Sequence, residues 1–300
     1  MITEFVLEVV AEEGCALPWF AGYECRAAVL SAVKGFDESL AEVLHDGVEY
    51  PGGRGRRSVI VVRALRFSSG AWSVVGGRSP RRLPPWPPIQ GARVVAQAGA
   101  TGEMRVLILR DEYAVGFMAA LTSRIGKVID VAGCPLRVAS VRISVHDPVK
   151  VMEEASGDWD GADIRFITPT YLNPLTGDME YKILYPDPLH LMASAIATAR
   201  FVTGKELPKP EDIAQHLYIS GLDIETVKVE KGEQTPTGFT GWAKLRPKKE
   251  TDKQTRKLTQ ALLRLAEITG IGGNRSAGYG EVKIKFETQK NETTPQKQPT

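Results

Sequence analysis

The sequence contains few cysteines, and none of them forms a recognisable motif. Cys15, Cys25 and Cys134 are scattered over 300 residues with no C-x-x-C or metal-ligand spacing. This excludes a zinc ribbon and a disulfide-rich secreted scaffold. An odd number of cysteines in a chain without a secretory segment predicts buried free thiols and a reducing, cytoplasmic location.

Excess charge and long apolar runs are also missing. The formal net charge is only +2, so any basic surface must come from local clustering. No apolar stretch approaches the roughly 20 residues of a membrane helix. The N-terminus, MITEFVLEVVAEEG, has acidic rather than basic flanks, which argues against a signal peptide. We expect a protein without a membrane partner.

The sequence does contain enough apolar residues for two globular domains. Hydrophobic residues make up 43% of the chain, and 300 residues favour two domains over one. Alternating and helical periodicities in the first half predict a β-α-β-β-α-β order with extra strands, which is the ferredoxin-like unit. Residues 57–67 and 71–77 read as a pair of strands. The predicted strands are 2–12, 57–67, 71–77, 92–98, 104–110 and 135–148, and the predicted helices are 23–34, 36–47 and 112–126.

The second half repeats this order after an acidic, glycine-containing stretch at 152–163, which we interpret as a linker. We therefore predict the α+β class, with two tandem ferredoxin-like domains at 1–151 and 152–287. The apolar-poor residues 288–300 are predicted to be a disordered tail. The predicted strands are 163–172, 220–232, 237–247 and 281–287, and the predicted helices are 188–204 and 252–270.

Five glycines fall between residues 270 and 280, in the run TGIGGNRSAGYGEV. The order helix, loop, strand is the reverse of a dinucleotide-binding unit, and the partner motifs of a kinase loop are missing. Two interpretations remain. In the first, the glycines let exposed backbone N–H groups of the loop approach a phosphate chain closely, and Asn274, Arg275 and Ser276 add further donors. Alternatively, Gly270 ends a helix and a tight turn follows.

Four segments of the second half together carry a family resemblance. They are LLRLAEITGIGGNRSAGYGEVKI (262–284), RFITPTYL (165–172), LYPDPLHLMASAI (184–196) and TGFTGWAKL (237–245). The chain resembles the CRISPR repeat-processing endoribonucleases of the RAMP superfamily. The resemblance implies tandem ferredoxin-like folds and a metal-independent ribonuclease without cofactors, acting on precursor CRISPR RNA. It also implies RNA binding by the loop that contains Gly270, Gly272, Gly273, Gly278 and Gly280.

Cleavage of RNA without metal uses the 2′-hydroxyl of the substrate as nucleophile and leaves a 2′,3′-cyclic phosphate and a 5′-hydroxyl. It needs a group that titrates near neutrality and a cation beside the phosphorane, roles that suit histidine and Arg or Lys. The resemblance places the histidine at the Leu44–His45 pair, eleven residues after Lys34. On the residues alone, a surface histidine at a helix end is the alternative. His146 reads as a turn residue, and His190 and His216 as packed or capping residues.

Two positions depart from the family pattern. The helical slot that holds a tyrosine in some members is Leu30 here, with Tyr23 two turns earlier. Where some members have a lysine after the histidine, this chain has arginines, so Arg54, Arg56 or Arg57 would supply the charge. The predicted catalytic residues are therefore His45, Tyr23, Arg54 and Arg57, with Lys34 and Arg56 as RNA contacts.

Two further segments are candidate RNA contacts. Residues 78–90 combine cations with an aromatic ring suited to single-stranded RNA, or they form a loop that simply packs. The basic run 244–257 could hold a repeat stem by its phosphates, or it is a solvated connection. The residues singled out are Arg78, Arg81, Arg82, Trp86, Lys248 and Lys249.

Two other functions remain open from the sequence. The chain could be a non-catalytic RAMP RNA-binding subunit, either a silent repeat-binding paralogue or a scaffold of a CRISPR effector complex. More remotely, it could be an unrelated nucleotide-binding enzyme. The expected partners are repeat RNA, other effector subunits and a second copy of the chain.

Overall fold

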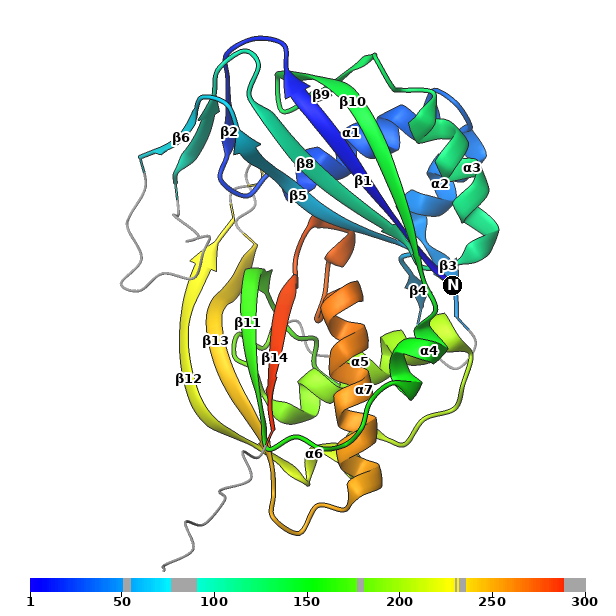
Figure 1. Cartoon of the computed structure of the whole chain (residues 1–300), viewed down its shortest axis with the longest axis vertical. Coiled ribbons are helices and arrows are strands. Elements are labelled where there is room, and N and C mark those ends of the chain that lie inside the picture. The colour runs from blue at the N-terminus through cyan, green and yellow to red at the C-terminus, as the bar shows by residue number, and fades with distance from the viewer. Residues whose placement is uncertain (51–54, 77–90, 177–180, 230, 232–235, 289–300) are drawn as a thin grey trace, which may run out of the picture.

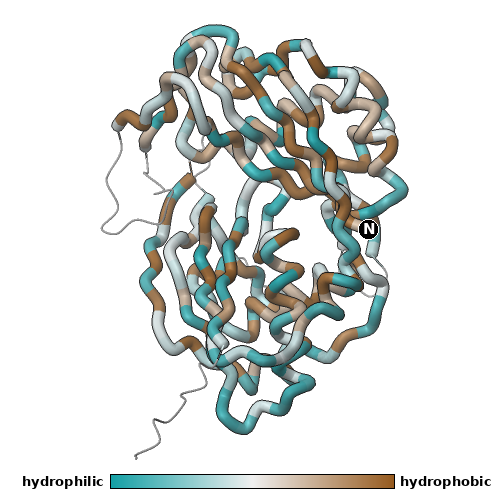
Figure 2. Tube along the Cα trace, in the orientation of Figure 1, coloured by the Kyte–Doolittle hydropathy of each residue, from teal (hydrophilic) through white to brown (hydrophobic). Residues whose placement is uncertain are grey.

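The computed structural model describes residues 1–50, 55–76, 91–176, 181–229, 231 and 236–288. They form two α+β units, one above the other in Figure 1, each with a twisted antiparallel sheet and helices on one face. In Figure 2 hydrophobic segments follow the strands, while the outer connections are hydrophilic. None of the helices in the described part of the chain is long and apolar enough to cross a membrane.

The N-terminal unit is built on a five-stranded sheet with the order β5-β8-β1-β10-β9. Without β9, the order of the strands by sequence is second, third, first, fourth, which is the ferredoxin-like arrangement. Asp37 begins the additional helix α2 by accepting a hydrogen bond from the Leu40 N–H. The elements are β1 (Ile2–Ala11), α1 (Gly22–Lys34), α2 (Glu38–Asp46), β5 (Ile60–Ser69), β8 (Thr101–Ile108), α3 (Asp111–Thr122), β9 (Val128–Val131) and β10 (Cys134–His146).

Two small sheets are added to this unit. The expected pairing of residues 57–67 with 71–77 is wrong. β5 pairs with β8, whereas β6 (Trp72–Val75) pairs with β7 (Arg93–Ala96). The left-handed Gly70 lies between β5 and β6, and the chain leaves the main sheet there. β2 (Cys15–Pro18) completes the second sheet, and β3 (Val48–Glu49) pairs with β4 (Arg56–Arg57).

The C-terminal unit has the same topology, with the strand order β12-β13-β11-β14. The predicted fold class, with two tandem ferredoxin-like domains, is confirmed. In this unit the sequence analysis missed the short helix α6. The elements are β11 (Gly161–Thr170), α5 (Pro188–Thr203), α6 (Pro210–Ala214), β12 (Leu217–Lys228), β13 (Thr237–Pro247), α7 (Lys253–Thr269) and β14 (Val282–Glu287).

The segment predicted as a linker is packed structure rather than a loose connection. It begins in helix α4 (Pro148–Glu153), which spans the proposed boundary between residues 151 and 152. Trp159 is buried against Phe286 and donates its indole N–H to the Arg256 carbonyl. The connection therefore contributes to the C-terminal core. Of the proposed tail, all but residue 288 lies outside the described residues.

The expectation of three free thiols is wrong for two of them. Cys15 and Cys134 form a disulfide, with their Cα atoms 5.2 Å apart and a sequence separation of 119. The fold brings the starts of β2 and β10 together, which no local spacing could indicate. Cys25 is free and buried, and its burial raises the pKa of the thiol to about 12.

Candidate active site

His45 occupies the last turn of α2, with its side chain 64% exposed. Its Nδ1 lies 2.8 Å from Asp46 Oδ1. This contact is the main reason why the pKa of Asp46 is lowered. An imidazole held at Nδ1 by a carboxylate directs Nε2 outward, and no hydrogen bond to Nε2 occurs within the described residues. His45 therefore has the geometry of an accessible acid or base.

Arg26 was missed in the sequence analysis and lies directly beside this histidine. Its Nη2 donates to the His45 carbonyl over 2.9 Å, while its Nε is buried without a partner in the described part of the chain. Burial lowers the pKa of Arg26, and the neighbouring Tyr23 and Asp46 oppose that effect. The sequence did contain a signal for Arg26. It follows Tyr23 by three residues in a predicted helix, and this spacing places both side chains on one face of α1.

The β3–β4 hairpin places two of the predicted arginines beside the end of α2. Arg56 Nη2 donates to the Gly47 carbonyl over 2.7 Å, and the Arg57 guanidinium lies over the Tyr50 ring at 5.6 Å. Gly47 has φ +76°, and a Cβ there would come within 2.3 Å of the Arg57 carbonyl, so the hairpin requires glycine at this turn. Arg54 lies outside the described residues.

The glycine-rich loop is a closed structural turn. Gly270 caps α7, which confirms the C-cap interpretation for that residue. The N–H groups of Gly272, Gly273 and Gly280 donate to Ser194 Oγ, the Tyr171 carbonyl and the Pro169 carbonyl. The expectation of free N–H donors is wrong at these three positions. RNA contact by the loop stays a prediction.

The loop packs against the start of α1. A Cβ on Gly22 would meet the Ala277 carbonyl at 2.2 Å, so the two backbones touch. This contact brings Asn274 to Tyr23, whose hydroxyl accepts a 2.8 Å hydrogen bond from Asn274 Nδ2. Tyr23 and Asn274, predicted from separate ends of the chain, therefore meet. Ser276 and Gly278 are buried in the same contact.

Arg275 points back into the protein rather than outward. Its Nη1 donates to the carbonyls of Thr269 and Gly270 at the end of α7, 3.3 and 3.4 Å away. Burial lowers its pKa to about 10, and the positive charge of Arg57 contributes to the shift. Two cations lie close enough to repel each other here.

Aromatic side chains line the seam beside the loop. The rings of Phe20, Tyr23 and Tyr171 each lie 5.0–5.9 Å from the ring of Tyr279. Lys231 lies over Tyr23 at 4.5 Å. The sequence analysis did not single out Tyr171, Tyr279 or Lys231, because they come from three separated loops.

The remaining residues predicted to contact RNA lie away from these aromatic side chains or among residues that the structure does not describe. Lys34 pairs with Glu38 on the surface, with 3.0 Å between Nζ and Oε1. Lys248 and Lys249 are exposed in the connection from β13 to α7, which is hydrophilic at the bottom of Figure 2. Arg78, Arg81, Arg82 and Trp86 lie in a segment that the structure does not describe.

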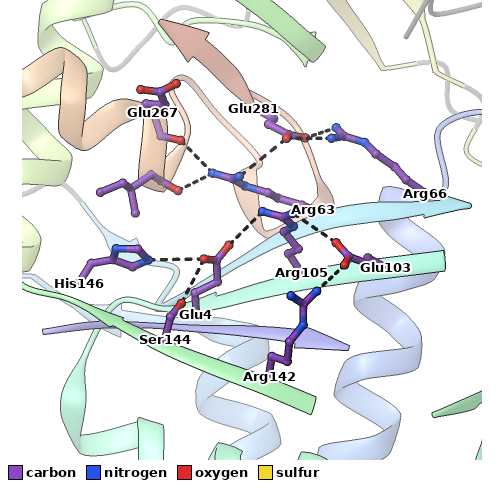
Figure 3. A network of polar contacts seen from close by, with 11 residues as sticks. Glu4, Arg63, Arg66, Glu103, Arg105, Arg142, Ser144, His146, Glu267 and Glu281 are labelled. Atoms are coloured by element: carbon purple, nitrogen blue, oxygen red, sulfur yellow. Dashed lines mark hydrogen bonds and ion pairs between the residues drawn. The ribbon is translucent and has the colours of Figure 1, made fainter. Parts of the chain in front are cut away.

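A buried ion cluster holds the two units together, as Figure 3 shows. Glu281, just before β14, pairs with both Arg63 and Arg66 of β5. Arg63 also donates to the carbonyls of Glu267 and Ile268 at the end of α7. These contacts fix the glycine loop relative to the N-terminal sheet.

The same sheet face carries a second, more exposed set of charges. His146, expected in a turn, is instead the last residue of β10, and its Nε2 lies 3.4 Å from Glu4 Oε2.

The described residues contain no group of three or more His, Cys, Asp or Glu side chains that could hold a metal ion.

Residues 164–282 match the model of the family described as CRISPR-associated endoribonuclease Cas6. This match confirms the resemblance predicted from the sequence. A search of curated proteins finds no match.

Solved structures show the same fold over nearly the whole chain. A product complex of Thermus thermophilus Cas6 (TTHB231) has a TM-score of 0.68 and 20% identity, over 95% of this chain and 100% of that one. A second product complex, of Cas6 (TTHA0078), has a TM-score of 0.63 and 18% identity over the same shares. The product of a Cas6-related gene from Pyrococcus furiosus has a TM-score of 0.58 and 11% identity, over 95% and 99%.

Proposed function

We propose that this chain is an endoribonuclease that binds CRISPR repeat RNA and cuts it by attack of the 2′-hydroxyl, without a metal ion. The observation that carries the proposal is the convergence of two independent features. The family match covers the glycine loop, and that loop packs against α1, whose Arg26 donates a hydrogen bond to the His45 carbonyl.

In the proposed reaction, neutral His45 accepts the proton of the 2′-hydroxyl at Nε2. Asp46 holds the Nδ1–H and stabilises the imidazolium that forms. The 2′-oxygen bonds to the adjacent phosphorus, the bond to the 5′-oxygen breaks, and that oxygen takes a proton. The products are a 2′,3′-cyclic phosphate and a 5′-hydroxyl.

The phosphorane gains negative charge that arginine side chains stabilise. Arg26 Nε has no hydrogen-bond partner among the described residues, and Arg57 lies close enough to Arg275 to lower its pKa. Arginine is a poor proton donor because its pKa lies above about 12 in water. The proton for the 5′-oxygen therefore comes from Tyr23, whose hydroxyl accepts from Asn274 and keeps its own hydrogen, or from water.

The test is incubation of the full chain with end-labelled cognate repeat RNA in excess EDTA, alongside RNAs that carry a single 2′-deoxy substitution. We expect one cut that survives EDTA and disappears with one 2′-deoxy position. His45→Ala should reduce the cleavage rate at least 100-fold. His216→Ala is the matched control, since His216 lies immediately before β12 in the other unit.

A second function is favoured by one observation, the arginines that replace the family's lysine after the histidine. Tight repeat binding without cleavage would move the chain to the non-catalytic RNA-binding class. An unchanged cleavage rate in His45→Ala would overturn the assignment of the catalytic group.

A further inference from the structure

The proposed function makes no use of the open face of the C-terminal sheet. Helices α5 and α7 cover the other face, as Figure 1 shows, and buried side chains such as Ile164 and Ala243 pack there. Because side chains alternate along a strand, their chain neighbours lie on the open face. The exposed residues of this face include Arg165 of β11, Trp242 of β13 and Lys283 of β14.

These three residues form one row across the sheet, which we call the Trp242 row. Arg165 lies directly opposite Trp242 on one side and Lys283 on the other. Residues opposite each other in an antiparallel pair are about 5 Å apart, so the row is about 10 Å long. Neither cation forms an ion pair within the described residues. An aromatic ring therefore lies beside two available positive charges.

The indole of Trp242 is held against the neighbouring strand. A Cβ on Gly221 of β12 would lie 3.5 Å from both Cη2 and Cζ3 of the ring. Glycine has no side chain there, so the ring lies against the β12 backbone. Trp242 nevertheless stays 41% exposed. A large ring supported in this way is a ready surface on which a base can stack.

Most of the other charges on this face already neutralise one another. Lys244 Nζ lies 2.6 Å from Glu287 Oε1 and 3.8 Å from Asp163 Oδ1. Arg246 Nη2 lies 3.4 Å from Glu287 Oε2. Positive charge for an outside partner is therefore concentrated in the Trp242 row, with the exposed Lys285 next along β14.

The edge strand β12 carries the opposite charge. Asp223 lies directly opposite Trp242, and Glu225 lies two residues further along the strand. Carboxylates repel phosphates, whereas Arg165 and Lys283 attract them. A nucleic-acid strand on this face would therefore run its backbone over β11 and β14 and direct its bases toward the ring of Trp242.

We propose that this face is a second RNA site, which binds single-stranded RNA separately from the candidate active site. A base stacks on Trp242, and the adjacent phosphates contact Arg165 and Lys283. Trp242 is on a central strand of a four-stranded sheet, and aromatic side chains on sheets of this kind stack unpaired bases. Duplex RNA does not fit, because its bases are already stacked on one another.

The first experiment measures binding of a labelled 2′-O-methyl oligouridine of about 12 nucleotides by fluorescence anisotropy. This probe lacks the 2′-hydroxyl, so it cannot be cut by the proposed reaction. We expect a Kd of roughly 1–100 µM at low salt. Trp242→Leu should weaken binding roughly 5- to 100-fold, and Trp242→Phe should restore most of it.

Tyr218→Leu is the matched control for the ring. Tyr218 is a 43% exposed aromatic residue of the same sheet, but it lies opposite Arg246, whose charge is already paired. Its substitution should change the Kd less than twofold. Binding of an RNA duplex of the same length should be equally insensitive to Trp242→Leu, because the duplex offers no unstacked base.

Two further readouts separate direct contact from a structural effect. Stacking on Trp242 should quench tryptophan fluorescence, and Trp242→Phe should bind without that part of the quenching. Arg165→Gln should lower the slope of log K against log salt concentration by about 0.7, as expected for one lost phosphate contact on a single strand. Arg137→Gln, which removes an arginine paired with Glu12 in the other unit, should leave this slope unchanged.

Equal affinity of the oligouridine for the wild type and Trp242→Leu would overturn the inference, as would quenching that persists unchanged in Trp242→Phe. If Trp242→Leu weakened duplex binding as much as single-strand binding, the assignment to single strands would be wrong. Binding of an oligoglutamate peptide that depends on Trp242 would instead assign the face to a protein partner. None of these measurements involves cleavage, so their failure leaves the proposed function untouched.

Discussion

Glu281→Gln should destabilise the contact between the two units more than any other single removal of charge in Figure 3. The Glu281 side chain is only 5% exposed, and its two oxygens face the guanidinium of Arg66. Arg63 Nη1 lies 3.8 Å from Glu281 Oε1. A glutamine keeps the shape but removes the negative charge that pairs with both arginines.

The expected cost follows from how far each partner is desolvated. Removing one partner of a fully buried ion pair costs about 3–5 kcal/mol. Arg66 is 30% exposed, so water recovers part of its solvation, and Arg63 keeps its two carbonyl acceptors. We therefore expect about 2–3 kcal/mol, which corresponds to a fall in Tm of roughly 5–10 °C.

The assay is urea unfolding followed by circular dichroism and by tryptophan fluorescence. Glu103→Gln is the matched control, because Glu103 pairs with Arg105 and Arg142 on the exposed part of the same sheet face. That change should cost only about 0–1 kcal/mol. Equal stability of the two variants, or a loss below about 0.5 kcal/mol in Glu281→Gln, would refute the reasoning.

Three further predictions concern the glycine loop, the active site and α2. Gly280→Ala should destabilise the fold by several kcal/mol, since its Cβ would lie 1.9 Å from a backbone carbonyl oxygen, whereas Gly99→Ala, at a similar φ but in open space, should cost about 1 kcal/mol in urea unfolding. Arg26→Ala should lower the single-turnover cleavage rate at least tenfold with less effect on RNA binding in a filter assay; the reverse pattern would make Arg26 a binding residue only. Asp37→Ala should lower the Tm at pH 7, and this difference should diminish as the pH falls through the lowered pKa of Asp37. The N-cap hydrogen bond lowers that pKa, so its contribution is present above the unfolded pKa and is lost as pH falls through the folded one; a difference that did not change with pH would contradict this.

The sequence predicted the elements well where periodicity and caps are local. The alternation of ITEFVLEVVA matches β1, and the apolar spacing of residues 253–269 matches α7. The N-cap Asp37 and the C-cap Gly204 lie within one residue of ends of the predicted helices 36–47 and 188–204. Family resemblance, rather than periodicity, selected His45, and its catalytic role stays a prediction.

The errors have one physical cause, which is that pairing between distant segments leaves no local pattern. Strand propensity identified residues 71–77 but could not say that β7 rather than β5 would be the neighbour. Cys15 and Cys134 meet only because the fold brings the starts of β2 and β10 together. Trp159 looked like a residue in a linker, although its ring fills the C-terminal core.

The sequence alone determined the α+β class, the tandem repeat and the position of the glycine loop, since these depend on residue periodicity, turn chemistry and a family signature. Only the tertiary structure decided how the loop is used, by packing Gly22 against Ala277 and drawing the loop N–H groups inward. It also placed Arg26 beside His45 and set Trp242 beside Arg165 on the open face of the C-terminal sheet. These features depend on long-range contacts, whose free energy comes from surfaces that meet only in the folded chain.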